Sequence, residues 1–212
     1  ECQQQWQQYQ YIKAFAPGSK DKPQTFRVSR KLYGRTADEA VLTDCFERVS
    51  SGHSEMVVVA GYSGVGKTVL VQQLQQPELA TKGFFISGKC DQYNRSQPYS
   101  ALTQAFPMLI QQLLSEPEVV LDAWRETLTT ALGNNAGVIV ELLPELALIT
   151  GHPPAVPPLP AAEAEARFVL AWSQFINALC SPERPLVLFL DDLQWAGVPT
   201  LTLLEKQLAN HP

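Results

Sequence analysis

The sequence predicts an α/β fold in which a parallel sheet lies between layers of helices. Short apolar runs of strand length occur at residues 56–60, 84–87 and 185–190. Longer segments, in which apolar residues recur with helical spacing, separate these runs. Strands separated by helices form parallel sheets, and strands that are buried on both faces read as continuous apolar runs.

Before the second strand, the sequence predicts a helix, a first strand and a second helix. A helix is expected over residues 38–49, with Thr36 as its N-cap. The run 56–60 predicts a buried strand, and a glycine-rich loop and a helix over 68–76 follow it. The run 84–87 predicts the second strand.

A helical insertion is expected over about residues 99–180, between the second and third strands. Pro107 predicts a kink or break in its first helix. Five prolines within residues 153–160 predict a stiff, extended spacer rather than a partner-binding motif. The helices are expected at 99–114, 115–132, 138–143 and 161–180, and another follows the third strand at 201–208.

The glycine-rich loop carries the strongest functional signal. It matches the pattern G-x-x-x-x-G-K-[ST] in full, through Gly61, Tyr62, Ser63, Gly64, Val65, Gly66, Lys67 and Thr68. Glycines let the backbone curl around a phosphate with its N–H groups pointing inward. Lys67 is expected to reach the β- and γ-phosphates during catalysis, and the Thr68 hydroxyl to ligate Mg²⁺. The probability that a chain of this length matches all four fixed positions of the pattern by chance is on the order of one percent or less.

Two carboxylates end the third strand. Ligands bind at the carboxyl ends of parallel strands, so Asp191 and Asp192 are predicted to belong to the same site as the loop. Asp191 is expected to hold Mg²⁺, and Asp192 to act as the general base for an attacking water. The alternative is that both residues simply mark the end of a strand.

Composition limits the class of protein. The formal net charge is −5, which argues against a nucleic-acid partner. The sequence has neither a C-x-x-C pair nor an apolar run of membrane-spanning length, so we expect reduced thiols and a cytoplasmic location. Residues 1–31 are polar and predict a linker that follows an absent N-terminal domain. Both ends look cut, so a domain over 32–212, truncated at its C-terminus, is expected.

These motifs resemble those of a known family. The loop and the acidic pair resemble the Walker A and Walker B motifs of the STAND branch of AAA-like P-loop ATPases. Tyr33, Gly34 and Arg35 resemble that branch's N-terminal signature, which implies that they lie near the adenine. The resemblance implies a three-layer P-loop NTPase fold, with the helical insertion between Walker A and Walker B. It also implies ATP and Mg²⁺ as cofactors.

A closer resemblance is to the ATPase module of large hybrid signalling kinases that are common in cyanobacteria. Residues 85–92, Arg95, Pro98, Tyr99, residues 144–146 and the proline segment carry it. It implies a Ser/Thr kinase domain before this chain, and a helical region, a GAF domain and a histidine kinase after it. Gly197 and Cys90 depart from the family, which usually has Asp and Phe at these positions.

The favoured hypothesis is a regulatory ATPase that acts as a nucleotide-operated switch within a multidomain signal-transduction kinase, with slow hydrolysis. Its expected partners are the nucleotide and the flanking kinase and sensor domains of the same chain, without a membrane. A homo-oligomer formed through the full-length protein is compatible with this hypothesis. The alternatives are an AAA-type motor or loader acting on DNA or protein, a small-molecule kinase, and an inactive nucleotide-binding scaffold.

Overall fold

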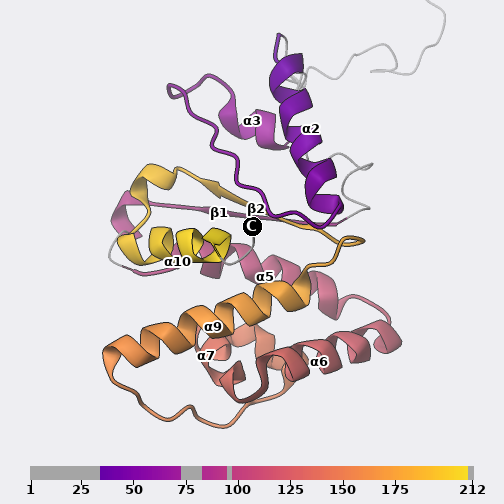
Figure 1. The fold of residues 1–212 in the computed structure, drawn as a ribbon, viewed down its shortest axis with the longest axis vertical. Coiled ribbons are helices and arrows are strands. Elements are labelled where there is room, and N and C mark those ends of the chain that lie inside the picture. The colour runs from indigo at the N-terminus through magenta and orange to yellow at the C-terminus, as the bar shows by residue number, and fades with distance from the viewer. Residues whose placement is uncertain (1–33, 73–82, 95–96, 210–212) are drawn as a thin grey trace, which may run out of the picture. The chain divides into compact units, whose positions relative to one another are not determined.

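The computed structural model describes residues 34–72, 83–94 and 97–209, and in these ranges two parallel strands pack against a large helical region (Figure 1). The strands are β1 (Phe84–Lys89) and β2 (Leu186–Asp191). The helices are α2 (Thr36–Ser50), α3 (Lys67–Gln72), α5 (Ser100–Leu114), α6 (Glu118–Leu132), α7 (Ala136–Leu142), α8 (Ala147–Thr150), α9 (Ala161–Leu179) and α10 (Val198–Ala209). The predicted linker 1–31 lies outside the described residues.

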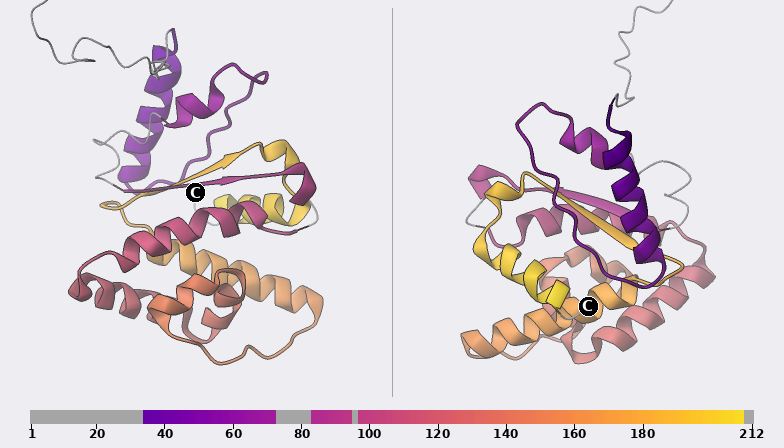
Figure 2. Two further views of the ribbon diagram at one scale, coloured as in Figure 1. Left: turned by 180° about the vertical axis from the view of Figure 1, so that it is seen from behind. Right: turned by 45° about the horizontal axis from the view of Figure 1, so that its top comes forward.

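The sheet joins segments that are far apart in the sequence. β1 and β2 run parallel, with Phe84 opposite Leu186 and Lys89 opposite Asp191. Both strands therefore end at the same edge of the sheet. Helices lie on both faces, with α2 and α3 on one side and α5 on the other (Figures 1 and 2). This arrangement confirms a mixed α/β fold with parallel strands, and most of the described chain is helical.

The main core lies between β1, α5 and the helices of the insertion. Aromatic rings fill its centre: the ring of Phe106 meets Trp172 edge-on at 5.2 Å between centroids and lies 5.4 Å from Phe175. These three side chains are at most 1% exposed. Aromatic pairs at such separations stabilise a core beyond the burial of their area. None of the described helices is long and apolar enough to cross a membrane.

The segment before the loop differs from the prediction. Residues 56–60 do not form a strand, and Met56, Val57 and Val58 are 54%, 42% and 68% exposed. The predicted buried strand is therefore wrong for this structure. An apolar β-branched run favours a strand, but a strand also needs a neighbour that pairs with its N–H and C=O groups. In the described ranges, residues 56–60 have no such neighbour.

Two local predictions about helices also fail. α5 continues through Pro107 without a break, because the side chains around it are among the most deeply buried in the core. Their packing outweighs the cost of about 3 kcal/mol for a proline inside a helix. Thr36 is the first residue of α2 rather than its cap; Arg35 occupies the cap position, and no side chain caps the helix.

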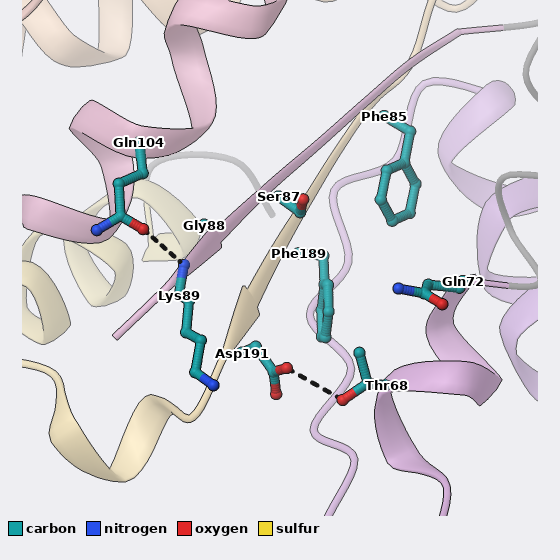
Figure 3. A pocket seen from close by; sticks show the side chains of 9 residues that line it. All are labelled: Thr68, Gln72, Phe85, Ser87, Gly88, Lys89, Gln104, Phe189 and Asp191. Atoms are coloured by element: carbon teal, nitrogen blue, oxygen red, sulfur yellow. Dashed lines mark hydrogen bonds between the residues drawn. The ribbon is translucent and has the colours of Figure 1, made fainter. Parts of the chain in front are cut away.

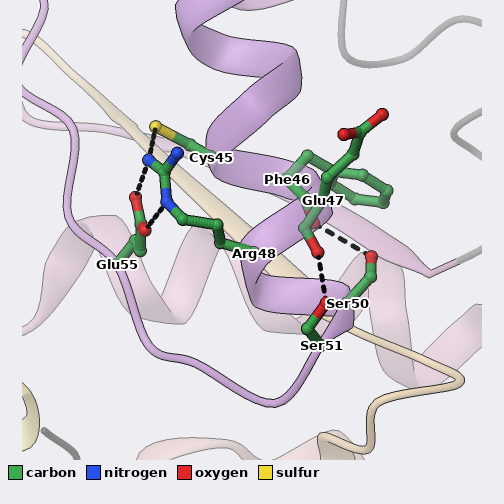
Figure 4. Close-up of polar contacts among 7 residues, drawn as sticks. All are labelled: Cys45, Phe46, Glu47, Arg48, Ser50, Ser51 and Glu55. Carbon is green, nitrogen blue, oxygen red and sulfur yellow. Dashed lines mark hydrogen bonds and ion pairs between the residues drawn. The ribbon is translucent and has the colours of Figure 1, made fainter.

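A polar cluster fixes the end of α2 to the segment that leads into the loop (Figure 4). Arg48 donates hydrogen bonds through Nε and Nη2 to the Glu55 carboxylate, and its Nη2 lies 3.1 Å from the Cys45 sulfur. The hydrogen bonds from Arg48 and Cys45 lower the pKa of Glu55 to about 2. Glu55 is therefore charged at neutral pH, and the contact ties Glu55 to the end of α2.

Gly88 allows the closest approach between the sheet and α5. A Cβ atom at this position would lie 1.9 Å from the carbonyl oxygen of Ala101, which is backbone and has little freedom to move. Real Cβ atoms essentially never come this close to another heavy atom. The absence of a side chain at Gly88 therefore sets the spacing between β1 and α5.

We expect Gly88→Ala to lower the free energy of unfolding by about 1–3 kcal/mol, because β1 and α5 must move apart to admit the methyl group. Urea denaturation followed by circular dichroism measures the change. Ser87→Ala is the matched control, because Ser87 is exposed on the opposite face of the same strand. Equal unfolding midpoints for the two variants would contradict the prediction.

Candidate functional site

The loop of residues 61–68 is shaped by its glycines. Gly64 and Gly66 have φ angles of 82° and 89°, in the left-handed region that residues with a side chain rarely adopt. The loop passes directly into α3, which begins at Lys67. Tyr62 is 89% exposed, so its side chain projects away from the protein. The structure thus bears out a tight, glycine-dependent turn between residues 61 and 66.

The Lys67 side chain folds back over the loop. Its ammonium group donates hydrogen bonds to the backbone oxygens of Gly61 and Tyr62, each at 2.9 Å. These carbonyls hold a positive charge at the concave side of the turn. Phosphate oxygens accept stronger, charge-assisted hydrogen bonds than carbonyls do, so an anion could take over these contacts.

The loop is joined to the end of β2 by one hydrogen bond. The Thr68 hydroxyl donates to Oδ2 of Asp191 at 3.0 Å, across 123 residues of sequence (Figure 3). Both side chains are partly buried and line the same pocket. The structure therefore brings together the two side chains that were predicted to hold Mg²⁺, and both offer the hard oxygen atoms that this cation prefers.

The second acid is held in a constrained position. Asp192 has a φ of 53°, in the left-handed region that aspartate can enter, and its N–H donates to Oδ1 of Asp191 at 3.0 Å. Gln194 donates to Oδ1 of Asp192 at 3.0 Å, and the Lys89 ammonium lies 3.3 Å from Oδ2. The hydrogen bonds from Gln194 and Lys89 lower the pKa of Asp192. Asp192 is therefore a carboxylate at neutral pH.

A pocket of about 340 Å³ opens beside these groups (Figure 3). Because side chains alternate along a strand, Ser87 and Lys89 share one face of the sheet with Asp191. Helices also contribute to the lining: Gln104 of α5 is part of it, and its Oε1 accepts a hydrogen bond from the Lys89 N–H at 3.4 Å. The pocket is lined by Thr68, Gln72, Phe85, Ser87, Gly88, Lys89, Gln104, Phe189 and Asp191.

The predicted adenine-side residues are only partly described. Tyr33 lies outside the described residues. Gly34 has a φ of 73°, which starts the turn into α2. Arg35 reaches the loop: Nη2 donates to the backbone oxygen of Val65 at 3.2 Å, and Nη1 pairs with Asp38 at 2.9 Å. Arg35 thus contacts the loop backbone, while its contact with an adenine remains a prediction.

Lys89, Gln104 and Gln194 had no predicted role: the structure places Lys89 and Gln194 against Asp192, and Gln104 against the backbone of Lys89. A signal for Lys89 was present, because it ends β1 just as Asp191 ends β2. The rule that placed Asp191 at the ligand-binding edge applies equally to a neighbouring parallel strand. Gln104 and Gln194 carried no comparable signal, since their positions depend on the packing of α5 and on the turn after Asp192.

Comparisons with known proteins place this arrangement in context. A family model described as an AAA ATPase domain matches residues 31–212. The hybrid signal transduction histidine kinase G of Dictyostelium discoideum is 39% identical over 196 residues, which are 92% of this chain and 6% of that protein. Histidine protein kinase 1 of Candida albicans is 23% identical over 177 residues, which are 77% of this chain and 7% of that protein. The chain thus spans a small part of these relatives, and no solved structure matches it.

The environment of Asp192 predicts a specific pH dependence. A folded-state pKa below the unfolded value of about 3.9 means that this carboxylate adds stability above that pH, and that the contribution is lost as the pH falls through the folded pKa. We expect carboxyl NMR titration to give a pKa below 3.9 for Asp192, and a higher value in Gln194→Leu. A pKa for Asp192 at or above 3.9 would refute the assignment.

Proposed function

Because the chain belongs to the AAA ATPase domain family, we propose that it binds ATP with Mg²⁺ at residues 61–68 and acts as the nucleotide-operated switch of a signal-transduction kinase. The observation that carries this proposal is the hydrogen bond between Thr68 and Asp191. It joins the phosphate loop and the acidic strand end into one site. A phosphate-binding loop without such a partner could hold an anion but would lack the oxygen ligands for its cation.

The side chains at this site fit Mg²⁺. The cation binds oxygen in near-octahedral geometry at about 2.0–2.1 Å, so neighbouring ligands in its shell lie about 3 Å apart. The oxygens of Thr68 and Asp191 are 3.0 Å apart, which matches that spacing. One or two protein oxygens suffice, because phosphate oxygens and waters complete the shell. When bound, Mg²⁺ would neutralise negative charge on the phosphates.

The protein groups then divide the work of hydrolysis. Lys67 exchanges its two loop carbonyls for the β- and γ-phosphate oxygens and so positions the phosphate chain. Asp192 accepts the proton of the water that attacks the γ-phosphate, with Gln194 holding its carboxylate in place. A carboxylate with a lowered pKa is a weak base. Slow turnover would suit a switch whose state must persist.

The wider context favours a switch over a motor. The net charge of −5 argues against a DNA-translocating function. The two relatives are named as histidine kinases, and this chain would be one module of a similarly large protein. In this proposal residues 32–212 are the ATPase domain, with the helical insertion at about 99–180, and flanking kinase and sensor domains respond to its nucleotide state. The cysteines Cys45, Cys90 and Cys180 are free, which fits a cytoplasmic protein.

Lys67→Ala tests nucleotide binding. We expect saturating Mg-ATP to raise the melting temperature of the unaltered protein by several degrees, because a ligand at 100 times its Kd adds about 2.7 kcal/mol of stability. Lys67→Ala should lose most of this shift. Lys206→Ala is the control, since Lys206 is an exposed lysine that pairs with Glu165 away from the loop. Equal ATP affinity for Lys67→Ala and the unaltered protein would sink the proposal. Parallel titrations with ADP and GTP define the base preference.

Asp192→Asn tests the role of the general base. We expect release of inorganic phosphate from ATP to slow by a factor of about 100 or more, while ATP affinity is retained, because general bases contribute about 10²–10⁴ in rate. Asp122→Asn on α6 is the matched control. An unchanged rate for Asp192→Asn would show that another group accepts the proton. Transfer of phosphate to a metabolite, or strong stimulation by DNA, would favour the kinase or the motor instead.

A further inference from the structure

We propose that Lys89 is the residue by which this site distinguishes a nucleoside triphosphate from a diphosphate. In the absence of a γ-phosphate its ammonium pairs with Asp192, and a γ-phosphate takes the ammonium away from that carboxylate. This inference rests on the proposed function, because it assumes that a nucleotide binds at residues 61–68. It adds to that function a specific residue whose contacts differ between the triphosphate-bound and the diphosphate-bound site.

The position of Lys89 suits this role. It is the last residue of β1, opposite Asp191 in the register of the sheet. Figure 3 shows its side chain extending toward the Asp191 carboxylate, which lies between Lys89 on one side and Thr68 on the other. Lys89 is therefore on the side of the metal-binding oxygens away from the loop. In this proposal the γ-phosphate extends from the loop past Thr68 and Asp191 toward Lys89.

The contact between Lys89 and Asp192 is easily exchanged. The Lys89 side chain is 66% exposed and that of Asp192 36%, and the nitrogen–oxygen distance of 3.3 Å is longer than the 2.7–2.9 Å of a strong charged hydrogen bond. Exposed ion pairs of this kind shift an equilibrium by a factor of about five at most. The terminal phosphate of a triphosphate carries more negative charge and more acceptor oxygens than a carboxylate does.

Lys67 makes a different contribution. Its ammonium is held within the loop by two backbone oxygens, and in the proposed function it reaches both the β- and the γ-phosphate. It therefore strengthens the binding of diphosphates as well as triphosphates. Lys89 lies at the end of β1 and is separated from the loop by the Thr68–Asp191 contact, so its charge favours the nucleotide with the longer phosphate chain.

The test compares two affinities in the same protein. Isothermal titration with Mg-ADP and with a Mg-bound ATP analogue that resists hydrolysis gives the ratio of their dissociation constants. We expect Lys89→Met to weaken binding of the ATP analogue about ten-fold and to change ADP binding by less than two-fold. Lys89→Arg should keep most of the discrimination because it keeps the charge. Lys206→Met, which removes another exposed, ion-paired lysine, should change neither affinity.

Each outcome decides between distinct explanations. Equal weakening of both nucleotides in Lys89→Met would overturn the proposal, because a merely structural role for Lys89 would act on both. Unchanged affinity for both would also overturn it. If the unaltered protein binds neither nucleotide, the proposed function itself fails, and that result is distinguishable from a loss confined to Lys89→Met. Loss of the ATP preference in Lys89→Met, with rescue in Lys89→Arg, supports the assignment.

Discussion

The parallel pairing of β1 with β2 is the constraint on which the site depends. It aligns the ends of two strands that are separated by the whole helical insertion, and so sets Lys89 beside Asp191. Parallel strands require a crossover that returns the chain to the same edge. Here the insertion is that crossover, and its core packs against β1 through α5 at Gly88. The acidic pair is therefore positioned by the packing of helices far from it in the sequence.

A hydrogen bond also joins the segment before α5 to α10, the helix that follows Asp191 and Asp192. Asp192 begins a short turn that leads into α10. In α10 the hydroxyl of Thr200, which is 3% exposed, accepts a hydrogen bond at 3.2 Å from the N–H of Tyr99, just before α5. Tyr99 has a φ of 63°, a conformation that costs a non-glycine residue about 1–2 kcal/mol. The strained conformation of Tyr99 persists because the hydrogen bond to Thr200 and the start of α5 fix its backbone. A shift at Asp192 would therefore move α10, which is hydrogen-bonded to the helical insertion.

The sequence was sufficient for those parts of the site that local chemistry specifies. The loop could be predicted because it depends on glycines and on Lys67 at fixed spacing, and Asp191 could be predicted because it follows an apolar strand. Membership of the AAA ATPase domain family could also be predicted, and the family match confirms it. The strand at 56–60 failed because pairing needs a neighbour that the apolar pattern does not supply. Lys89 was missed although it ends a strand, because the predicted second strand stopped at residue 87 and its pairing with β2 is a long-range contact.

In the proposed mechanism, switching and hydrolysis place different demands on Asp192, and the proposed exchange of Lys89 would reconcile them. While Lys89 and Gln194 hold its carboxylate, Asp192 has a lowered pKa and is a weak base. In the proposed exchange, a γ-phosphate draws the Lys89 ammonium away from Oδ2 of Asp192, and the carboxylate keeps its contact with Gln194 at Oδ1. Oδ2 would then be free to accept a proton from the attacking water, and only when a phosphate that can be cleaved is present. The exchange that registers the triphosphate would thus also prepare its hydrolysis, which would limit how long the triphosphate state lasts.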